Sequence, residues 1–153
     1  MKINIYYFSK NSDRNLISLE GEFLSRIKFF IEVKMICLKP FAIKNDLSRE
    51  VVLKKEQVLI EDKLPTNFII LDELGEQMTS RKFATFLEKE LVDYGDLNIL
   101  IGGALGLSDE IKSKARKKIA ISQMTLTHDF CRVLLLEQIY RAFTIIKNIK
   151  YHY

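Results

Sequence analysis

The sequence predicts an α/β fold in which a mostly parallel sheet is flanked by helices. Short strand-like runs alternate along the chain with longer runs whose apolar residues recur at helical spacing. The apolar run 98–101 leads into three of the chain's six glycines, Gly102, Gly103 and Gly106, and then into a good helix cap, Ser108. With 153 residues, 48% apolar and 29% charged, the chain fits one globular domain, residues 1–153.

The first third of the chain is expected to form a strand, a helix and a second strand. Residues 2–8 alternate apolar and polar side chains, as a strand does. Apolar residues from Leu16 to Ile27 recur with the period of an amphipathic helix. Residues 31–37 alternate again, and Pro40 ends this second strand.

The middle of the chain predicts another helix and a buried strand. Ser48 is expected to cap a helix that Pro65 closes. The continuous apolar run 67–71 is typical of a parallel strand covered on both faces. Residues 72–75, Asp-Glu-Leu-Gly, are then expected to turn the chain.

Three further elements follow in the same alternating order. Thr79 or Ser80 is expected to cap a helix that Gly95 stops. After the glycine-rich run, residues 109–118 predict a helix with acids at its start and lysines at its end, as the helix dipole favours. Residues 119–121 predict a fifth short strand.

The last helix is expected from about residue 129 to residue 147, after a hydroxyl-rich loop at 122–127. It is apolar over more than half of its circumference, and one small domain rarely covers so wide a stripe. A second subunit that covers it is one explanation, and a central core helix is the other. The i,i+4 pair Glu137 and Arg141 suits a structural ion pair on this helix, at the subunit interface.

Composition limits the compartment and the chemistry. No apolar run approaches the ~20 residues of a membrane span, and the N-terminus lacks the apolar segment of a signal peptide, so we expect a cytoplasmic protein without a membrane partner. Cys37 and Cys131 stand alone, outside any metal-ligand spacing, and are expected to be reduced core residues. No metal site is predicted.

The positive charge lies toward the C-terminus. From Asp109 onward there are nine Lys or Arg residues against four Asp or Glu, whereas the first 108 residues hold fifteen against sixteen. A polyanion such as RNA is one partner for that end, and a solvated basic surface is the commoner meaning of such an imbalance. The same two explanations apply to the lysines of this region, Lys112, Lys114, Lys117, Lys118, Lys147 and Lys150.

The glycine-rich run from residue 101 to residue 107 predicts a ligand-binding corner. Glycine lets a ligand lie against bare backbone, and ligands of open α/β sheets gather at the carboxyl ends of strands. An ordinary turn between strand and helix is the alternative. The dinucleotide fingerprint GxGxxG and the Lys-Ser/Thr of a phosphate-binding loop are both absent, which disfavours phosphate binding here.

Three blocks together resemble one family. Residues 70–75 (Ile-Leu-Asp-Glu-Leu-Gly), residues 101–107 (Ile-Gly-Gly-Ala-Leu-Gly-Leu) and the long block 122–143 are similar to the RlmH family, methyltransferases of the knotted SPOUT superfamily. The resemblance implies a C-terminal deep trefoil knot, a homodimer, and methylation of N3 of a pseudouridine in 23S ribosomal RNA, free or in the assembled ribosome. It also implies S-adenosylmethionine as the cofactor.

The family's cofactor contacts fall on the ends of three predicted strands and the loops after them. Backbone groups there could read the adenine edge and the ribose, and apolar side chains could form the walls. Asp72 and Glu73 lie beside this stretch as turn residues that could approach the ribose or the methionine amine. The implied cofactor-binding residues are Leu71, Gly102, Ile121, Ser122, Gln123, Met124, Thr125 and Leu126.

Three residues are candidates for the chemistry. His128 has a suitable intrinsic pKa to accept the imide proton, and His152 is second; a cap or loop-orienting role is the alternative for His128. Arg132, one helical turn beyond His128, could hold a phosphate or stabilise negative charge on the uracil ring. An ion pair with Asp129 is its alternative role.

The chain departs from the family pattern at three positions. Thr127 replaces the proline of Leu-Pro-His and offers a helix cap, Leu105 stands where relatives are often polar, and Tyr153 stands where they carry Lys or Arg. Two other functions therefore stay open from the sequence: a noncatalytic RNA- or ribosome-binding protein with the same fold, and a knotted transfer RNA methyltransferase.

Overall fold

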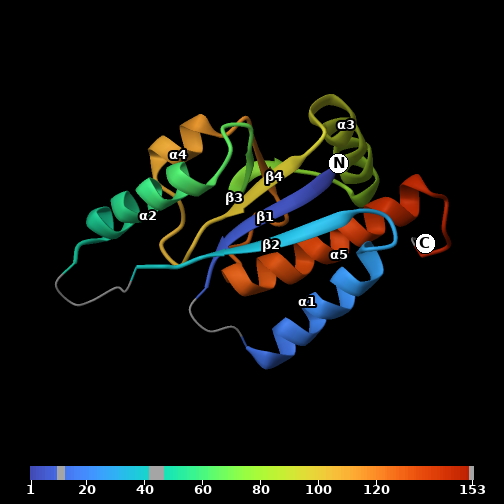
Figure 1. Ribbon diagram of the computed structural model, residues 1–153, viewed down its shortest axis with the longest axis horizontal. Helices are drawn as coiled ribbons and strands as arrows, with labels where there is room; N and C mark the ends of the chain where they lie inside the picture. The colour runs from blue at the N-terminus through green and yellow to red at the C-terminus, as the bar shows by residue number, and fades with distance from the viewer. Residues whose placement is uncertain (10–12, 42–46, 152–153) are drawn as a thin grey trace.

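Helices cover both faces of a five-stranded sheet in the computed structural model, which describes residues 1–9, 13–41 and 47–151 (Figure 1). The sheet order is β2-β1-β4-β3-β5, and every strand pairing is parallel, which confirms the α/β prediction. The strands are β1 (Lys2–Phe8), β2 (Glu32–Leu38), β3 (Ile69–Gln77), β4 (Leu97–Ile101) and β5 (Lys117–Ala120). The helices are α1 (Arg14–Ile27), α2 (Arg49–Lys63), α3 (Ser80–Tyr94), α4 (Asp109–Lys114) and α5 (His128–Ile146).

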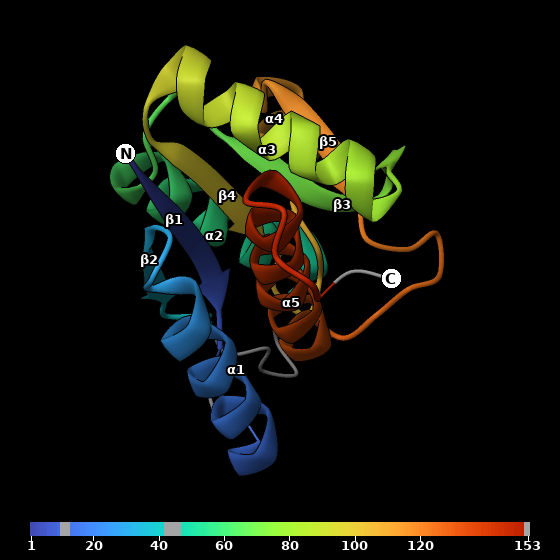
Figure 2. The ribbon, with the colours of Figure 1, turned by 90° about the vertical axis from the view of Figure 1, so that its right-hand side faces the viewer.

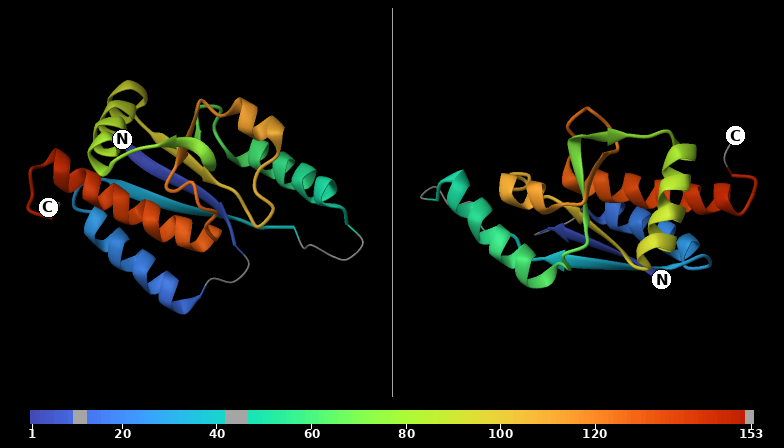
Figure 3. Two further views of the ribbon diagram at one scale, coloured as in Figure 1. Left: turned by 180° about the vertical axis from the view of Figure 1, so that it is seen from behind. Right: turned by 90° about the horizontal axis from the view of Figure 1, so that it is seen from above.

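The alternation of side chains along the strands sorts the core into two layers. Ile69 faces the layer that α1, α3 and α5 cover, and the next residue, Ile70, faces the layer that α2 and α4 cover. Figure 3 shows α1 and α5 on one side of the sheet and α2 and α4 on the other. Each layer therefore buries apolar side chains from one face of the centre of the sheet, where β1, β4 and the start of β3 lie.

Side-chain caps fix the helix starts. Ser48, Thr79 and Ser108, all expected as caps, accept hydrogen bonds from the backbone N–H groups three residues on. Thr127 caps α5 in the same way, toward the N–H of Phe130. Gly95 has a φ of +77° and ends α3, as predicted.

The predicted turn at residues 72–75 is wrong, because these residues lie inside β3. The strand pairs with β4 and β5 as far as Leu71, shifts register, and pairs again with β5 from Glu76, opposite Ile119. A Cβ on Gly75 would lie 2.7 Å from backbone atoms of Ile119. Glycine at this position thus permits the close approach of β3 and β5 at the register shift.

The predicted helix over residues 109–118 is too long. Helix α4 ends at Lys114, and its C-cap, Ala115, is already extended, with a ψ of 131°. Lys117 and Lys118 instead begin β5, opposite Ile69 and Ile70 of β3. Pairing with a distant strand therefore overrides the local preference of the lysines for a helix end.

Helix α5 packs against the sheet between α1 and α3 (Figure 2). Its apolar stripe is buried at positions including Leu135, Leu136 and Ile139, so a core position within this chain explains most of the stripe. Phe130 remains exposed, and Leu134 is partly exposed. Glu137 Oε1 accepts two hydrogen bonds from Arg141, at 2.5 Å from Nη2 and at 3.0 Å from Nε, as the i,i+4 spacing predicts.

No helix among residues 1–9, 13–41 and 47–151 combines the length and the apolar character that crossing a membrane requires. The knotted path of the C-terminal segment stays a prediction.

Candidate functional site

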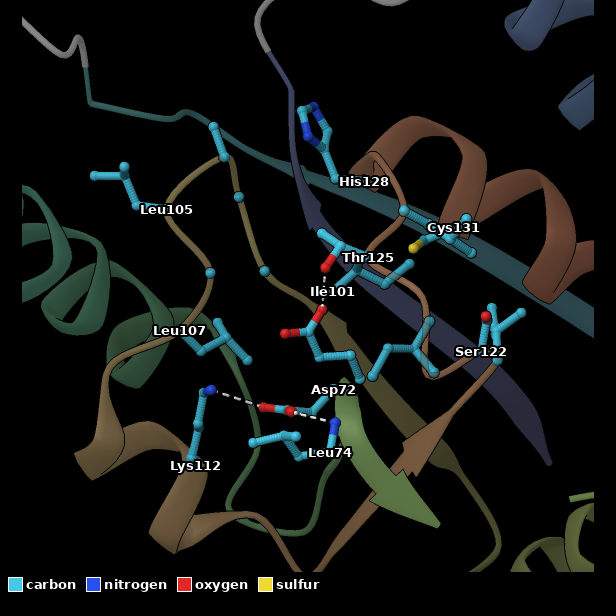
Figure 4. Close-up of a pocket in the computed structure, with 18 of the residues that line it drawn as sticks. Asp72, Leu74, Ile101, Leu105, Leu107, Lys112, Ser122, Thr125, His128 and Cys131 are labelled. Atoms are coloured by element: carbon cyan, nitrogen blue, oxygen red, sulfur yellow. Dashed lines mark hydrogen bonds and ion pairs between the residues drawn. The ribbon is translucent and has the colours of Figure 1, made fainter. Parts of the chain in front are cut away.

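A cavity of about 380 Å³ opens at the carboxyl ends of β4 and β5, beside the register shift in the middle of β3 (Figure 4). We call it the strand-end cavity. Ile101 ends β4, Ile121 follows β5, and Leu71 is the residue at which β3 shifts register; the chain segments after these residues complete the wall. Of the eight residues expected to bind a cofactor, seven line it, and the exposed Gln123 does not: Leu71, Gly102, Ile121, Ser122, Met124, Thr125 and Leu126.

The glycine loop, residues 102–106, folds back on itself at one side of the cavity. The N–H of Gly106, whose φ is +77°, donates to the carbonyl oxygen of Gly103 at 2.9 Å. A Cβ on Gly102 would lie 3.0 Å from the carbonyl carbon of Gly106 and 3.1 Å from Cγ of Leu107. The bare Cα of Gly102 is therefore required by the loop's own packing, and it leaves backbone exposed toward a ligand.

Helix α2 holds the glycine loop from outside. Arg49 Nη2 donates to the carbonyl oxygen of Leu105 at 3.2 Å, and the Ser108 hydroxyl lies 3.0 Å from Gln57 Oε1. Sequence reasoning missed Arg49 as a cavity residue, because 56 residues separate it from Leu105 and no local pattern joins them.

Asp72 and Lys112 form an ion pair at one side of the cavity. Lys112 Nζ lies 2.8 Å from Asp72 Oδ2, and the aspartate side chain is only 7% exposed. Burial alone would raise the pKa of Asp72, but hydrogen bonds from Lys112 and from the N–H of Leu74 bring this pKa below its ordinary value. Asp72 is therefore an ionised, paired group at neutral pH.

Glu73 connects β3 to the loop after β5. Its Oε2 accepts a hydrogen bond from the Thr125 hydroxyl at 2.6 Å, drawn as a dashed line in Figure 4. The Ser122 hydroxyl accepts from the N–H of Met124 at 2.9 Å in the same loop. These two bonds give the 122–127 loop a defined position over the cavity.

His128 lines the cavity at the start of α5, with its side chain 31% exposed. Its Nε2 lies 3.4 Å from Asp129 Oδ1. The neighbouring thiol of Cys131 also lines the cavity, and burial raises its pKa, so it is protonated at neutral pH. Cys131 is accordingly a wall residue and not a nucleophile.

Arg132 lies outside the cavity lining and is 1% exposed. Its Nη1 donates to Asp129 Oδ1 at 2.6 Å, its Nε donates to Glu20 Oε1 at 2.8 Å, and its guanidinium carbon lies 4.4 Å from the centre of the Tyr7 ring. The ion pair with Asp129, one of its two expected roles, is thus present. His152 and Tyr153 fall outside the described residues.

Half of the lysines considered for RNA contact are held in ion pairs. Lys112 pairs with Asp72, Lys114 with Glu61 and Glu110, and Lys117 with Glu76. The basic character of this end is therefore partly balanced by acids within the chain.

The strand-end cavity has the size and the lining for a nucleoside-sized group. Its volume lies in the range of small-ligand pockets, and apolar walls face a loop of bare backbone that can hydrogen-bond to a base or a ribose. Among the residues that the structure describes, no three His, Cys, Asp or Glu side chains gather as metal ligands.

Comparisons with known proteins agree with this geometry. The family model described as "Predicted SPOUT methyltransferase" matches residues 1–152. The chain is 40% identical to the ribosomal RNA large subunit methyltransferase H of Malacoplasma penetrans, over 99% of both chains. It is 36% identical to the protein of the same name from Thermosipho melanesiensis, over 100% of both.

Solved structures share the fold at low sequence identity. A probable methyltransferase from Bordetella pertussis superposes with a TM-score of 0.54 at 14% identity, covering 92% of this chain and 95% of that one. A probable methylase family protein from Haemophilus influenzae also superposes with a TM-score of 0.54, at 15% identity, covering 95% of this chain and 66% of that one. With the full-length match to the family model, the chain belongs to the SPOUT methyltransferase family.

Proposed function

We propose that this protein is a cytoplasmic enzyme that methylates N3 of a pseudouridine in 23S ribosomal RNA with S-adenosylmethionine as the donor. The observation that carries the proposal is the strand-end cavity, where the ends of β4 and β5, the middle of β3 and the glycine loop meet. The full-length relatives named as ribosomal RNA large subunit methyltransferases support the choice of RNA class.

The cofactor would be held by backbone and apolar groups. Leu71, Ile121 and Leu126 would form walls around the adenosine, and the glycine loop would offer backbone groups to it. When bound, the cofactor supplies a methyl group already made electrophilic by its sulfonium, so the protein mainly has to align donor and acceptor.

His128 would accept the proton that N3 of the pseudouridine must lose. Since Nε2 of His128 faces Asp129, Nδ1 is the ring nitrogen left to take the proton. With that proton on His128, N3 would be free to take the methyl group that the bound cofactor would supply. We assign Arg132 a positioning role, because its ion pairs fix the first turn of α5, on which His128 lies.

We also propose a homodimer. The exposed Phe130 and the partly exposed Leu134 leave apolar surface on α5 that α1 and α3 do not cover. Sedimentation velocity of the full chain tests this: a species of twice the chain mass is expected, and a fully active monomer would contradict it.

The activity is tested on RNA from cells that lack the gene. Purified protein, S-adenosylmethionine, and either deproteinised 23S RNA or assembled ribosomes are incubated, and nucleosides are analysed by mass spectrometry. One new N3-methylpseudouridine is expected in the large-subunit RNA. Methylation only of transfer RNA, or RNA binding without methylation, would overturn the proposal.

A further inference from the structure

The strand-end cavity contains two carboxylates in different electrostatic situations. Asp72 is neutralised by Lys112 at 2.8 Å. Glu73 makes no ion pair within the described part of the chain, and its Oε2 accepts only from the uncharged Thr125 hydroxyl at 2.6 Å. Glu73 therefore contributes a full negative charge to the cavity, while Asp72 contributes little.

Neither Lys112 nor Arg49, the lysine and the arginine of the cavity lining, forms an ion pair with Glu73 in the described part of the chain. Lys112 is paired with Asp72, and Arg49 keeps its charge but is directed at the carbonyl oxygen of Leu105 in the glycine loop. A ligand that brings a positive charge next to β3 is thus met by an unpaired carboxylate.

The donor and the spent product differ in charge at one atom. S-adenosylmethionine has a sulfonium, and after methyl transfer the same atom is an uncharged thioether. The base, the ribose and the amino acid part are shared, so contacts with those parts bind both molecules alike. The two molecules differ only in the methyl group and in the positive charge at sulfur, and a carboxylate near the sulfur responds to that charge.

We propose that Glu73 is the specificity residue by which the cavity prefers the charged donor over the uncharged-sulfur product; this inference rests on the proposed function. Thr125 keeps the Glu73 carboxylate over the cavity through a neutral bond, which fixes its direction and leaves its charge intact. After transfer the attraction is lost, so the product leaves more readily than the donor.

The test is calorimetric titration of the full chain with S-adenosylmethionine and with S-adenosylhomocysteine. Glu73→Gln keeps the size of the side chain and an oxygen that accepts from Thr125, and removes the charge. We expect it to reduce the donor-to-product affinity ratio roughly fivefold to twentyfold, mostly through weaker donor binding. Glu73 is exposed, so the variant is expected to fold, which circular dichroism checks.

Two further variants separate charge from structure. Glu76→Gln removes the same charge three residues along β3, at a residue that does not line the cavity and pairs with Lys117, and the ratio should stay within about twofold. Thr125→Val removes the hydrogen bond without removing the charge. Because that bond holds the carboxylate over the cavity, the ratio is expected to fall, but by less than in Glu73→Gln.

The outcomes are distinct. The inference is overturned if the Glu73→Gln variant binds both ligands with wild-type affinity, or if its affinity for both falls by the same factor. Wild-type protein that binds neither molecule overturns the proposed function and the inference together, whereas an unchanged ratio in a protein that binds both overturns the inference alone.

Discussion

Arg132 Nη1 lies 2.6 Å from Asp129 Oδ1, and the same guanidinium is 1% exposed and also bonded to Glu20. A buried arginine between two carboxylates matters to stability mainly because its removal would leave both carboxylates without a compensating charge. The group joins α1 to the first turn of α5. The position of His128, the residue before Asp129, therefore depends on a side chain that does not touch the strand-end cavity.

Replacing Arg132 with Met is expected to lower the free energy of unfolding by about 3–5 kcal/mol, because it leaves Glu20 and Asp129 without their cation. Urea denaturation followed by circular dichroism measures this. Lys34→Met is the control: its pair with Glu32 is exposed, so the loss should stay below about 1 kcal/mol. Equal losses for the two variants would contradict the structural role of Arg132.

His128→Gln is expected to slow methylation roughly 10²- to 10⁴-fold, the usual contribution of a general base, and to leave the affinity for S-adenosylmethionine within about twofold. Single-turnover rates on 23S RNA and calorimetry make the two measurements. If His128 only orients the loop, the affinity will fall along with the rate.

Gly102→Ala is expected to weaken cofactor binding at least about tenfold. A Cβ at this position would lie 3.0 Å from the backbone of Gly106, so the glycine loop itself must move. The control is Gly21→Ala in α1, where a Cβ meets nothing within 4 Å. That variant should gain about 0.5–1 kcal/mol of stability and bind the cofactor normally.

Lys112→Met is expected to destabilise the protein by about 1–3 kcal/mol at neutral pH, since it leaves the buried Asp72 carboxylate with only the Leu74 N–H as its partner. Because the folded-state pKa of Asp72 is depressed, its stabilisation is present above the unfolded pKa and lost as pH falls through the folded pKa. The difference between wild type and variant should therefore shrink below about pH 4. Urea titrations across pH 2.5–7 check this, and a constant difference would be inconsistent with the pair.

Local patterns predicted the elements whose limits are set by local chemistry. Ser48, Thr79, Ser108 and Gly95 mark helix ends through bonds to residues three or four positions away, which the sequence displays directly. The glycine loop could be predicted for the same reason, because its three glycines lie within five residues of one another.

Features that depend on distant partners could not be predicted. The strand order of the sheet has no local signal, and residues 72–75 lie within β3 because β5 pairs on either side of them, at Leu71 and at Glu76. The burial of Arg132 depends on Glu20, 112 residues earlier, and the ion pair of Lys112 with Asp72 has no local signal because forty residues separate the two.

The strand-end cavity depends on a part of the chain that comes late in the sequence. Its wall needs β5, an edge strand that pairs only with β3, and residues 121–126 that follow it. A chain without β5 and these residues lacks one wall of the cavity. A ligand in the cavity would contact both this edge and the rest of the sheet, so by mass action it would stabilise the docking of β5.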